Sequence, residues 1–374
     1  MKAPDPFIFI MKQYIEKITA RYLRYERHLS SVALLSGFIF DSLTLRRIDL
    51  PLENAILLGQ LFLASFGIAL VNLFDAKIIS GRLAGRLRTI AQLAIQFSFG
   101  ALFSGLVVFY FRSSSLGANW PFLFVLAALL VGNEFFRLRY QILTFQASIF
   151  FIALFSYLIF FIPVLVGAVG PSIFLLSGAV SLCVMALLYF SLRRLMPAQV
   201  RASTPSLVRA ICGIYLAMNA LYFANLIPPV PLAMKEAGVF RSVERISGTD
   251  TYRVTYEDAS WYRYFRPYDV IHVAKGEGAY VFSSIFAPTR LNTLIYHQWQ
   301  FYDEQKEEWL TTDRLAFPIF GGRDGGYRGY TAKSTLSTGQ WRVDIVTERG
   351  QRIGRVRFLV ARPDESLNLI SGIR

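Results

Sequence analysis

The sequence predicts an α-helical membrane bundle of about seven transmembrane helices, followed by an all-β domain of immunoglobulin-like sandwich type. Uncharged apolar runs of about 20 residues, long enough to cross a bilayer, recur through residues 1–230. The hydrophobic period changes to two from Val239 onward. Charge divides the chain at the same place, because residues 1–230 hold 19 Lys+Arg and 8 Asp+Glu, whereas the shorter 231–374 holds 20 and 17.

Composition excludes an ordinary soluble protein, since 54% of the residues are hydrophobic and only 17% are charged, against about 25% charged in soluble domains. Most of the net charge of +14 lies in the apolar part. We therefore interpret it as a topology signal and as attraction to membrane lipid, and expect no nucleic-acid partner. Cys183 and Cys212 both lie in apolar runs, so no disulfide scaffold is expected.

Six apolar stretches are predicted to be spans. Four are single runs, and the uncharged stretch 140–192 is divided by Gly167, Gly170 and Pro171 into two helices joined by a tight turn. The single runs are 54–74, 89–111, 113–133 and 210–234. A seventh stretch, 29–45, is interrupted by Asp41.

Basic residues alternate between successive connections, which sets the orientation. The rich connections carry Lys77, Arg82, Arg86 and Arg88, then Arg137 and Arg139, then Arg193, Arg194 and Arg201; the poor ones carry only Arg112 or none. The rich side is predicted to be cytoplasmic. The basic N-terminal tail lies on the same side only if residues 29–45 also cross the membrane. The prediction is therefore seven spans, with the N-terminus in the cytoplasm and the C-terminal domain outside.

Three domains follow from this pattern. Residues 1–28 form an amphipathic tail with a basic face, which either lies on anionic inner-leaflet lipid or pairs as a short coiled coil. Residues 29–230 form the transmembrane domain, and 231–374 form the external β-domain behind a stiff Pro-rich connection at 228–231. The predicted strands are 239–246, 252–256, 270–274, 280–286, 294–302, 309–319, 327–333, 340–347 and 352–360.

Several motifs resemble a bacterial C-terminal domain family that is known only as a domain of unknown function. The motifs are His297-Gln298-Trp299, the loop from Gly321 to Tyr330 with Lys333-Ser334, Gly339-Gln340-Trp341-Arg342-Val343, and Gly354 to Phe358. Asp41 to Thr44, Arg46 to Asp49 and Asn133-Glu134-Phe135 resemble the multi-span region that often precedes that domain. The resemblance implies an inner-membrane protein of a Gram-negative bacterium, with a periplasmic domain in the cell envelope, and it implies no activity.

Metal, cofactor and nucleotide motifs are lacking. His272 and His297 are 25 residues apart with no cysteine near them, so we predict no metal site. Gly276-Glu277-Gly278 lacks the third glycine of a dinucleotide fingerprint, and no nucleophile elbow occurs. We therefore predict no cofactor.

The Gly-rich loop 321–329 is the main external candidate. Its backbone N–H groups, with Arg323 and Arg328 and the neighbouring Tyr327 and Tyr330, suit an anionic glycan or a partner protein. The alternative is a structural connection whose glycines satisfy positive φ. His297 and Trp299 of the His-x-Trp motif are grouped with this binding hypothesis.

A second cluster, 261–268, holds five aromatics and two arginines, and sugar stacking, headgroup contact and a strand face explain it equally well. Within the membrane, polar residues fall toward the cytoplasmic ends of their helices: Asn72, Gln92, Gln96, Asn133 and Glu134. They either form a polar pocket in which Glu134 ionises, or the amides bridge helices while Glu134 pairs with Arg137.

The sequence favours a non-catalytic membrane protein that presents a periplasmic β-sandwich for binding or assembly with an envelope glycan or protein. The alternative is a membrane enzyme or transporter that handles a lipid-linked or small polar substrate through the intramembrane cluster.

Overall fold

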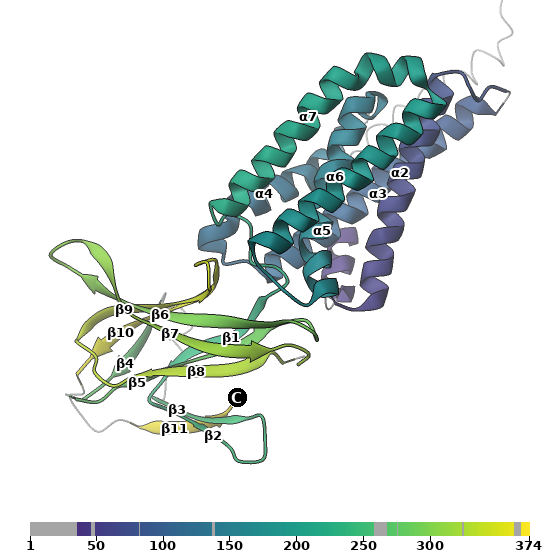
Figure 1. The fold of residues 1–374 in the computed structure, drawn as a ribbon. Helices are drawn as coiled ribbons and strands as arrows, with labels where there is room; N and C mark the ends of the chain where they lie inside the picture. The colour runs from purple at the N-terminus through teal and green to yellow at the C-terminus, as the bar shows by residue number, and fades with distance from the viewer. Residues whose placement is uncertain are drawn as a thin grey trace, which may run out of the picture.

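A computed structural model describes residues 36–45, 49–81, 83–136, 139–257, 268–274, 276–323, 325–362 and 368–374. It contains a helical bundle followed by a β-domain attached to one end of it (Figure 1). This confirms the predicted order of a helical part and then a β part. The predicted tail 1–28 lies outside the described residues, as do 261–267 of the aromatic cluster.

Five helices of the described chain are long and apolar enough to cross a membrane: α2 Pro51–Asp75, α3 Ala84–Arg112, α5 Leu143–Val166, α6 Pro171–Leu195 and α7 Pro197–Phe223. The sixth, α4 Leu116–Gly132, is apolar but shorter, and a 3₁₀ turn, η1 Arg139–Gln141, precedes α5. Residues 36–44, within the predicted first span, are also helical. The division of 140–192 is confirmed, because Gly167 ends α5 with a φ of 73° and Pro171 begins α6.

The last helix differs from the prediction at both ends. Only Met196 separates α6 from α7, so α7 begins well before residue 210 and includes Arg201 and Arg209. It ends at Phe223 rather than at 234. The apolar residues that follow are not helical, and Ile227, Val230 and Leu232 are buried where the bundle meets the β-domain. Their hydrophobicity reflects burial within the protein and not a longer span.

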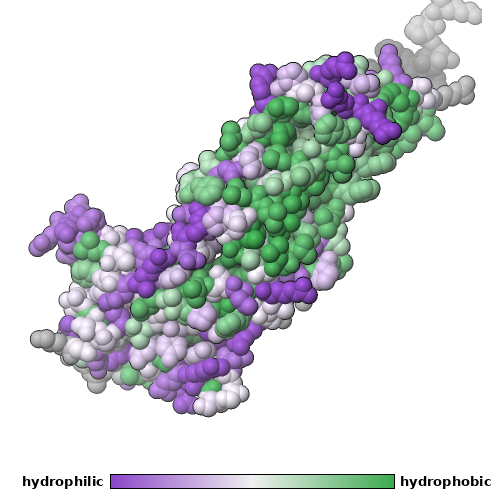
Figure 2. Space-filling view, viewed as in Figure 1, coloured by the Kyte–Doolittle hydropathy of each residue, from purple (hydrophilic) through white to green (hydrophobic). Residues whose placement is uncertain are grey.

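The bundle has an apolar surface as well as an apolar core. Large side chains that face outward are more than half exposed, among them Phe62, Phe97, Phe124, Leu187 and Leu216. Figure 2 shows a continuous hydrophobic surface over the helices and a far more hydrophilic one over the β-domain. An apolar exterior of this extent fits hydrocarbon better than water.

The described connections that are rich in lysine and arginine gather at the end of the bundle far from the β-domain (Figure 1). They join α2 to α3, α4 to α5 and α6 to α7. Among the described residues, the other end holds the Gly167 turn and Arg112, whose guanidinium donates to Ser42 O and Leu45 O. Arg46 and Arg47, in the connection that leads into α2, lie outside the described residues. For the described connections, the predicted alternation of charge corresponds to two opposite ends of one bundle.

The described β-domain comprises three sheets. The β1-β5-β8 sheet packs against the five-stranded β4-β10-β9-β6-β7 sheet, and the outer β11-β3-β2 sheet covers the other face of β1-β5-β8. The strands are β1 Ala233–Phe240, β2 Ser242–Arg245, β3 Tyr252–Glu257, β4 Asp269–His272, β5 Ala279–Phe286, β6 Asn292–Asp303, β7 Glu308–Phe320, β8 Tyr327–Lys333, β9 Gly339–Thr347, β10 Arg352–Ala361 and β11 Leu369–Ile373.

The third sheet is a departure from the two-sheet immunoglobulin-like prediction, as is the parallel pairing of β4 with β10. The predicted strand 239–246 divides at Arg241, whose N–H donates to Thr255 O, and the chain passes there from one sheet to the next. The outer sheet covers Phe240 and Phe282, which would otherwise be exposed apolar rings. The structure thus supports a β-domain but not an immunoglobulin-like topology.

The β-domain contacts the bundle through the turn between β9 and β10. The Arg349 guanidinium lies 4.6 Å from the centroid of the Tyr222 ring and 5.2 Å from that of Phe223, at the end of α7. Gln351 Nε2 donates to Ile227 O at 3.5 Å. From the bundle side, Asn119 Nδ2 lies 3.3 Å from the carbonyl oxygens of Asn225 and Leu226. These contacts fix the connection between the two parts.

Candidate functional site

The predicted external site residues separate into a buried pair and an exposed group. His297 and Trp299, on β6, are fully buried between the five-stranded sheet and the β1-β5-β8 sheet. His297 Nε2 lies 2.8 Å from Ser283 Oγ, and its Nδ1 lies 2.9 Å from Thr331 Oγ1, which also accepts from Trp299 Nε1 at 3.1 Å. The His-x-Trp motif therefore builds a hydrogen-bonded layer inside the domain, and His297 and Trp299 cannot contact an external ligand.

Burial also fixes the charge of this histidine. It lowers the pKa of His297 to about 3, because a charged imidazole would lose its hydration in the core. The ring is therefore neutral at physiological pH, with both nitrogens satisfied by hydroxyl groups. Its role in the structure is to order the core.

The Gly-rich loop follows β7 and contains glycines that the backbone requires. A Cβ on Gly321 would lie 1.7 Å from Pro288 O, and one on Gly329 would lie 2.5 Å from the Phe317 ring. Gly326 has a φ of 83°, and a Cβ there would lie 2.6 Å from Ser284 Oγ. Gly325 differs, since its nearest neighbour would be Arg328 Nη2 at 3.5 Å. The structural explanation of the glycines therefore accounts for most of them.

The arginines beside this loop form an exposed cluster with a second loop that the sequence analysis did not connect to it. Arg323 Nη1 lies 3.2 Å from Asp250 Oδ1, in the turn between β2 and β3, and Arg328 Nη1 donates to Asp250 O at 3.1 Å. Arg245 Nη2 lies 3.5 Å from the same Asp250 carboxylate. An open hollow of about 530 Å³ is lined by Arg245, Ser247, Gly248, Thr249 and Asp250.

Tyrosine rings adjoin these arginines. The Arg323 guanidinium lies 5.0 Å from the Tyr327 ring centroid. Tyr330 contacts Tyr252 and Tyr280, with centroid distances of 5.9 and 6.0 Å, and is 38% exposed. Burial raises the pKa of Tyr252, and the nearby Arg245 and Arg323 oppose that rise. We call this group the arginine–tyrosine corner: Arg245, Asp250, Tyr252, Tyr280, Arg323, Tyr327, Arg328 and Tyr330.

The corner has an excess of positive charge, because Arg245 and Arg323 face the one Asp250 carboxylate while Arg328 donates to the Asp250 backbone carbonyl. Guanidinium groups can present paired N–H donors to a carboxylate or a phosphate. Exposed tyrosine rings offer flat apolar faces with a polar edge. The corner therefore has the chemistry to bind an anionic ligand that also has an apolar face, such as a charged sugar. The predicted residues Arg323, Tyr327, Arg328 and Tyr330 are together; Arg245 and Asp250 were missed.

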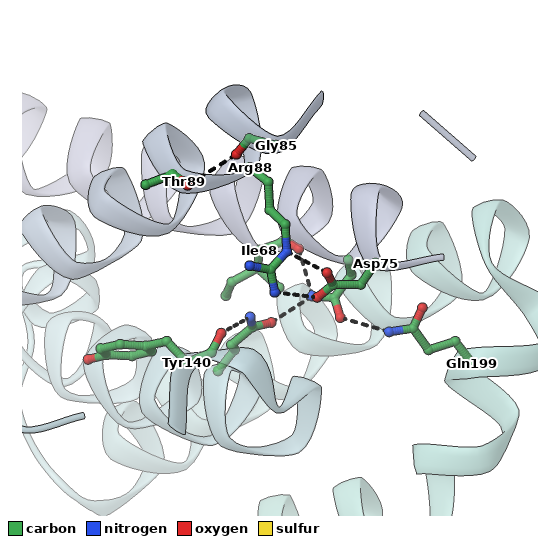
Figure 3. Close-up of polar contacts among 9 residues, drawn as sticks. Ile68, Asp75, Gly85, Arg88, Thr89, Tyr140 and Gln199 are labelled. Carbon is green, nitrogen blue, oxygen red and sulfur yellow. Dashed lines mark hydrogen bonds and ion pairs between the residues drawn. The ribbon is translucent and has the colours of Figure 1, made fainter. Parts of the chain in front are cut away.

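The polar residues inside the helical bundle form a different kind of arrangement. Asn72 is fully buried; its Nδ2 donates to Gln146 Oε1 at 2.6 Å, and its Oδ1 accepts from Gln199 Nε2 at 3.3 Å. Gln146 Nε2 in turn donates to Tyr140 O at 2.5 Å (Figure 3). These contacts join α2, η1, α5 and α7 at the end of the bundle far from the β-domain.

The same chain of hydrogen bonds continues to α3 and α4. The Tyr140 hydroxyl donates to Asn133 Oδ1 at 2.5 Å, and Asn133 Nδ2 donates to Gln96 O at 2.9 Å. Gln96 Nε2 returns a longer bond to Asn133 O at 3.4 Å. Gln92 and Glu134 are partly buried, one turn before Gln96 and directly after Asn133. Nearby, Arg88 Nε lies 2.5 Å from Asp75 Oδ1 (Figure 3).

The structure thus brings Asn72, Gln96 and Asn133 into one network through Tyr140 and Gln146, which the sequence analysis missed. The buried amides bind one another and the backbone, as groups that bridge helices do. This arrangement favours the bridging interpretation of the amides over the substrate pocket.

Residues 292–360, from β6 into β10, match a family described as "Protein of unknown function (DUF2914)". No curated protein matches the chain. Among solved structures, the chain is similar to Pseudomonas fluorescens alkylpurine DNA glycosylase AlkC bound to DNA containing an abasic site analog, with 11% identity over 83% of this chain and 99% of that chain. The TM-score of 0.22 does not indicate a shared fold. The β-domain therefore contains a domain of a family of unknown function.

Proposed function

We propose that this protein is a non-catalytic protein of the bacterial inner membrane that binds an anionic glycan of the cell envelope at the arginine–tyrosine corner. In this account seven helices cross the membrane, the N-terminus is cytoplasmic, and the β-domain lies in the periplasm. The observation that carries the proposal is the convergence of Arg245, Arg323 and Arg328 on the single Asp250, beside the exposed Tyr330 and the half-buried Tyr327.

The corner suits a glycan because it combines two kinds of contact. Guanidinium groups bind the carboxylate or phosphate of an acidic sugar, and tyrosine rings stack against the C–H face of a pyranose. Arg323 is 40% exposed at its side chain and Asp250 is 51% exposed, so a ligand anion can replace Asp250 without a change of the fold. Surface ion pairs of this kind contribute only about 0–1 kcal/mol, so the exchange is inexpensive.

The bundle supports the proposal by holding the β-domain in one position. Arg349 packs on the Tyr222 and Phe223 rings, and the connection 224–232 is short and buried from Ile227 onward. A binding domain held close to a membrane surface meets envelope polymers at a fixed height. A domain on a flexible linker would not.

The experiment uses the full chain in detergent micelles and a carboxylated probe, a uronic-acid oligosaccharide, with a neutral dextran of equal length as the uncharged comparison. We expect the uronate to bind and the dextran not to. Removing two charge-assisted contacts in Arg323→Ala plus Arg328→Ala should weaken uronate binding by a factor on the order of 100. Calorimetric titration measures both affinities.

The matched control is Arg253→Ala, which removes an exposed arginine from β3, opposite Glu244 in the strand register. It changes the net charge without touching the corner, and uronate binding should stay within twofold of the wild type. Equal binding by the wild type and the double variant would show that the corner is not the site. If the corner bound a partner protein and no glycan, the proposed class of ligand would be wrong.

A further inference from the structure

The outer face of the five-stranded sheet carries a second cluster of arginines, away from the corner. Strand alternation places Trp341, Val343, Val356 and Phe358 in the core, and so turns their neighbours to the opposite face. We call these neighbours the arginine ladder: Arg342, Arg352, Arg355 and Arg357, with Asp344 between them. Asp344 is the carboxylate that they share.

Asp344 is already engaged. Arg355 binds it in a bidentate fashion, with Nε at 2.5 Å from Oδ1 and Nη2 at 2.7 Å from Oδ2. Arg352 Nε lies 3.4 Å from Oδ2, but this buried nitrogen makes no hydrogen bond among the described residues. The four arginines of the ladder therefore share one carboxylate among the described residues, and the ladder has a net positive charge.

The other two arginines face each other. Arg357 on β10 is the direct cross-strand partner of Arg342 on β9. Like charges at such positions destabilise a sheet. Arg342 Nε donates to Gln300 Oε1 at 2.6 Å, whereas Arg357 is exposed. Burial, followed by the charges of Arg355, Arg352 and Arg357, lowers the pKa of Arg342 to about 10, and the Asp344 carboxylate opposes this shift.

An aromatic hollow adjoins this pair. It has a volume of about 260 Å³ and is lined by residues that include Tyr268, Trp309, Gln340 and Arg357. The Arg342 guanidinium lies 4.2 Å from the Trp309 ring centroid. A ligand whose anionic group lies between the two guanidiniums would therefore place its adjoining ring against Trp309 and Tyr268.

We propose that Arg342 and Arg357 bind the phosphate group of a sugar phosphate whose ring occupies this aromatic hollow. A phosphate has enough oxygens to accept paired N–H bonds from two guanidinium groups at once, and it removes the repulsion between them. The volume of the hollow accommodates one monosaccharide ring. The site is distinct from the corner and does not depend on the function proposed there.

One end of the arginine ladder lies close to the helical bundle. A Cβ on Gly117, in the first turn of α4, would lie 4.0 Å from Arg352 Nη1. From Arg352 to Arg357 the strand extends about 17 Å, at roughly 3.3 Å per residue. The phosphate could therefore belong to a free sugar phosphate or to one that is linked to a membrane lipid, and the two sources share the same chemistry at the site.

The test uses the full chain in nanodiscs of phosphatidylcholine, with glucose 1-phosphate, inorganic phosphate and glucose as probes. We expect glucose 1-phosphate to bind most tightly and glucose not to bind. Arg357→Gln should weaken glucose 1-phosphate binding about tenfold, and Arg342→Gln plus Arg357→Gln should abolish it. Arg253→Ala and the corner variant Arg323→Ala plus Arg328→Ala should leave this binding unchanged.

Two further arms make the result decisive. Arg357→Lys keeps the positive charge but not the paired N–H donors of the guanidinium group, so it should retain part of the affinity that Arg357→Gln loses. The second arm repeats the measurement in nanodiscs of phosphatidylglycerol. If these nanodiscs abolish glucose 1-phosphate binding, the site binds the phosphate of a lipid headgroup. If glucose 1-phosphate binding is unchanged, the site binds a sugar phosphate. The proposal is overturned if neither phosphate probe binds, or if the double glutamine variant, shown to be folded by near-UV circular dichroism, binds as the wild type does.

Discussion

The Asn72 side-chain nitrogen lies 2.6 Å from Gln146 Oε1, so that two fully buried amides 74 positions apart join α2 to α5. Gln146 also donates to Tyr140 O, and Tyr140 donates to Asn133. A chain of buried amides and a phenol therefore connects these helices, in addition to their apolar packing and to separate bonds such as Tyr157 to Asn54. Because each of these polar groups has a partner within the protein, the network stabilises the bundle.

Replacing Asn72 should therefore destabilise the bundle. Asn72→Ala leaves Gln146 Oε1 without its donor in an apolar interior, which should lower the free energy of unfolding by about 1 kcal/mol. Asn219→Ala is the matched control, because Asn219 Nδ2 donates to Tyr215 O of its own helix. Thermal unfolding in detergent, followed by helical circular dichroism, compares the two. Equal effects would contradict a special role for the network.

The two adjacent glycines of the loop should respond differently to alanine. Gly326→Ala places a Cβ against Ser284 Oγ at 2.6 Å and forces a φ of 83° on an L-residue, so it should destabilise the β-domain by about 1–3 kcal/mol. Gly325→Ala meets nothing closer than 3.5 Å and should be nearly neutral. Thermal unfolding measured by tryptophan fluorescence is suitable, since four of the five tryptophans lie in residues 231–374. A destabilising Gly325→Ala would contradict the geometry.

The buried His297 should make the β-domain sensitive to acid. Its pKa falls from 6.5 to about 3 on folding, so below pH 6.5 the unfolded chain binds a proton that the folded chain does not. Stability from this group is complete above pH 6.5 and decreases as the pH falls toward 3, with a loss of about 2 kcal/mol at pH 5. The loss should vanish in His297→Gln, whose stability should vary less between pH 7 and pH 5. A pH profile identical to that of the wild type would exclude His297 as the cause.

The orientation of the β-domain should depend on Arg349. Arg349→Ala removes its contacts with the Tyr222 and Phe223 rings, and cation–π contacts of this kind contribute about 0.5–2 kcal/mol. We expect faster proteolysis in the connection 224–232. Glu348→Ala, at the exposed neighbouring position, should leave the cleavage rate unchanged. The measurement is a time course of limited proteolysis on the full chain in detergent.

Local patterns predicted most of the fold. Uncharged runs located the helices, and the Gly167 to Pro171 break was correct because those residues stop or start helices whatever surrounds them. Eight of the nine predicted strands correspond to single observed strands, because alternation is a local signal. The end of α7 was misplaced, since hydropathy does not distinguish burial in lipid from burial beneath a β-domain. The short edge strand β11 carries little alternation and was missed.

The sites were harder to predict because long-range pairing creates them. Arg323 and Asp250 are separated by more than 70 residues, and only the packing of the outer sheet brings their loops together. Tyr140 and Gln146 lay within an uncharged run that predicted only helix. Arg342 and Arg357 become neighbours through the register of β9 with β10, which the sequence did not specify. His297 and Trp299 were assigned to the surface because a motif does not reveal on which face of a sheet its side chains lie.

The central claim is that the corner of the β-domain, and not the polar residues inside the helical bundle, carries the function. The most direct measurement is the amount of acidic sugar that co-purifies from native membranes with the full chain, determined by hydrolysis and sugar analysis. We expect equal amounts with the wild type and Glu134→Gln, and at least a tenfold loss with Arg323→Ala plus Arg328→Ala, as about 1.4 kcal/mol or more of binding free energy is removed. Retention by the double arginine variant together with loss in Glu134→Gln would contradict the account and favour a site within the membrane.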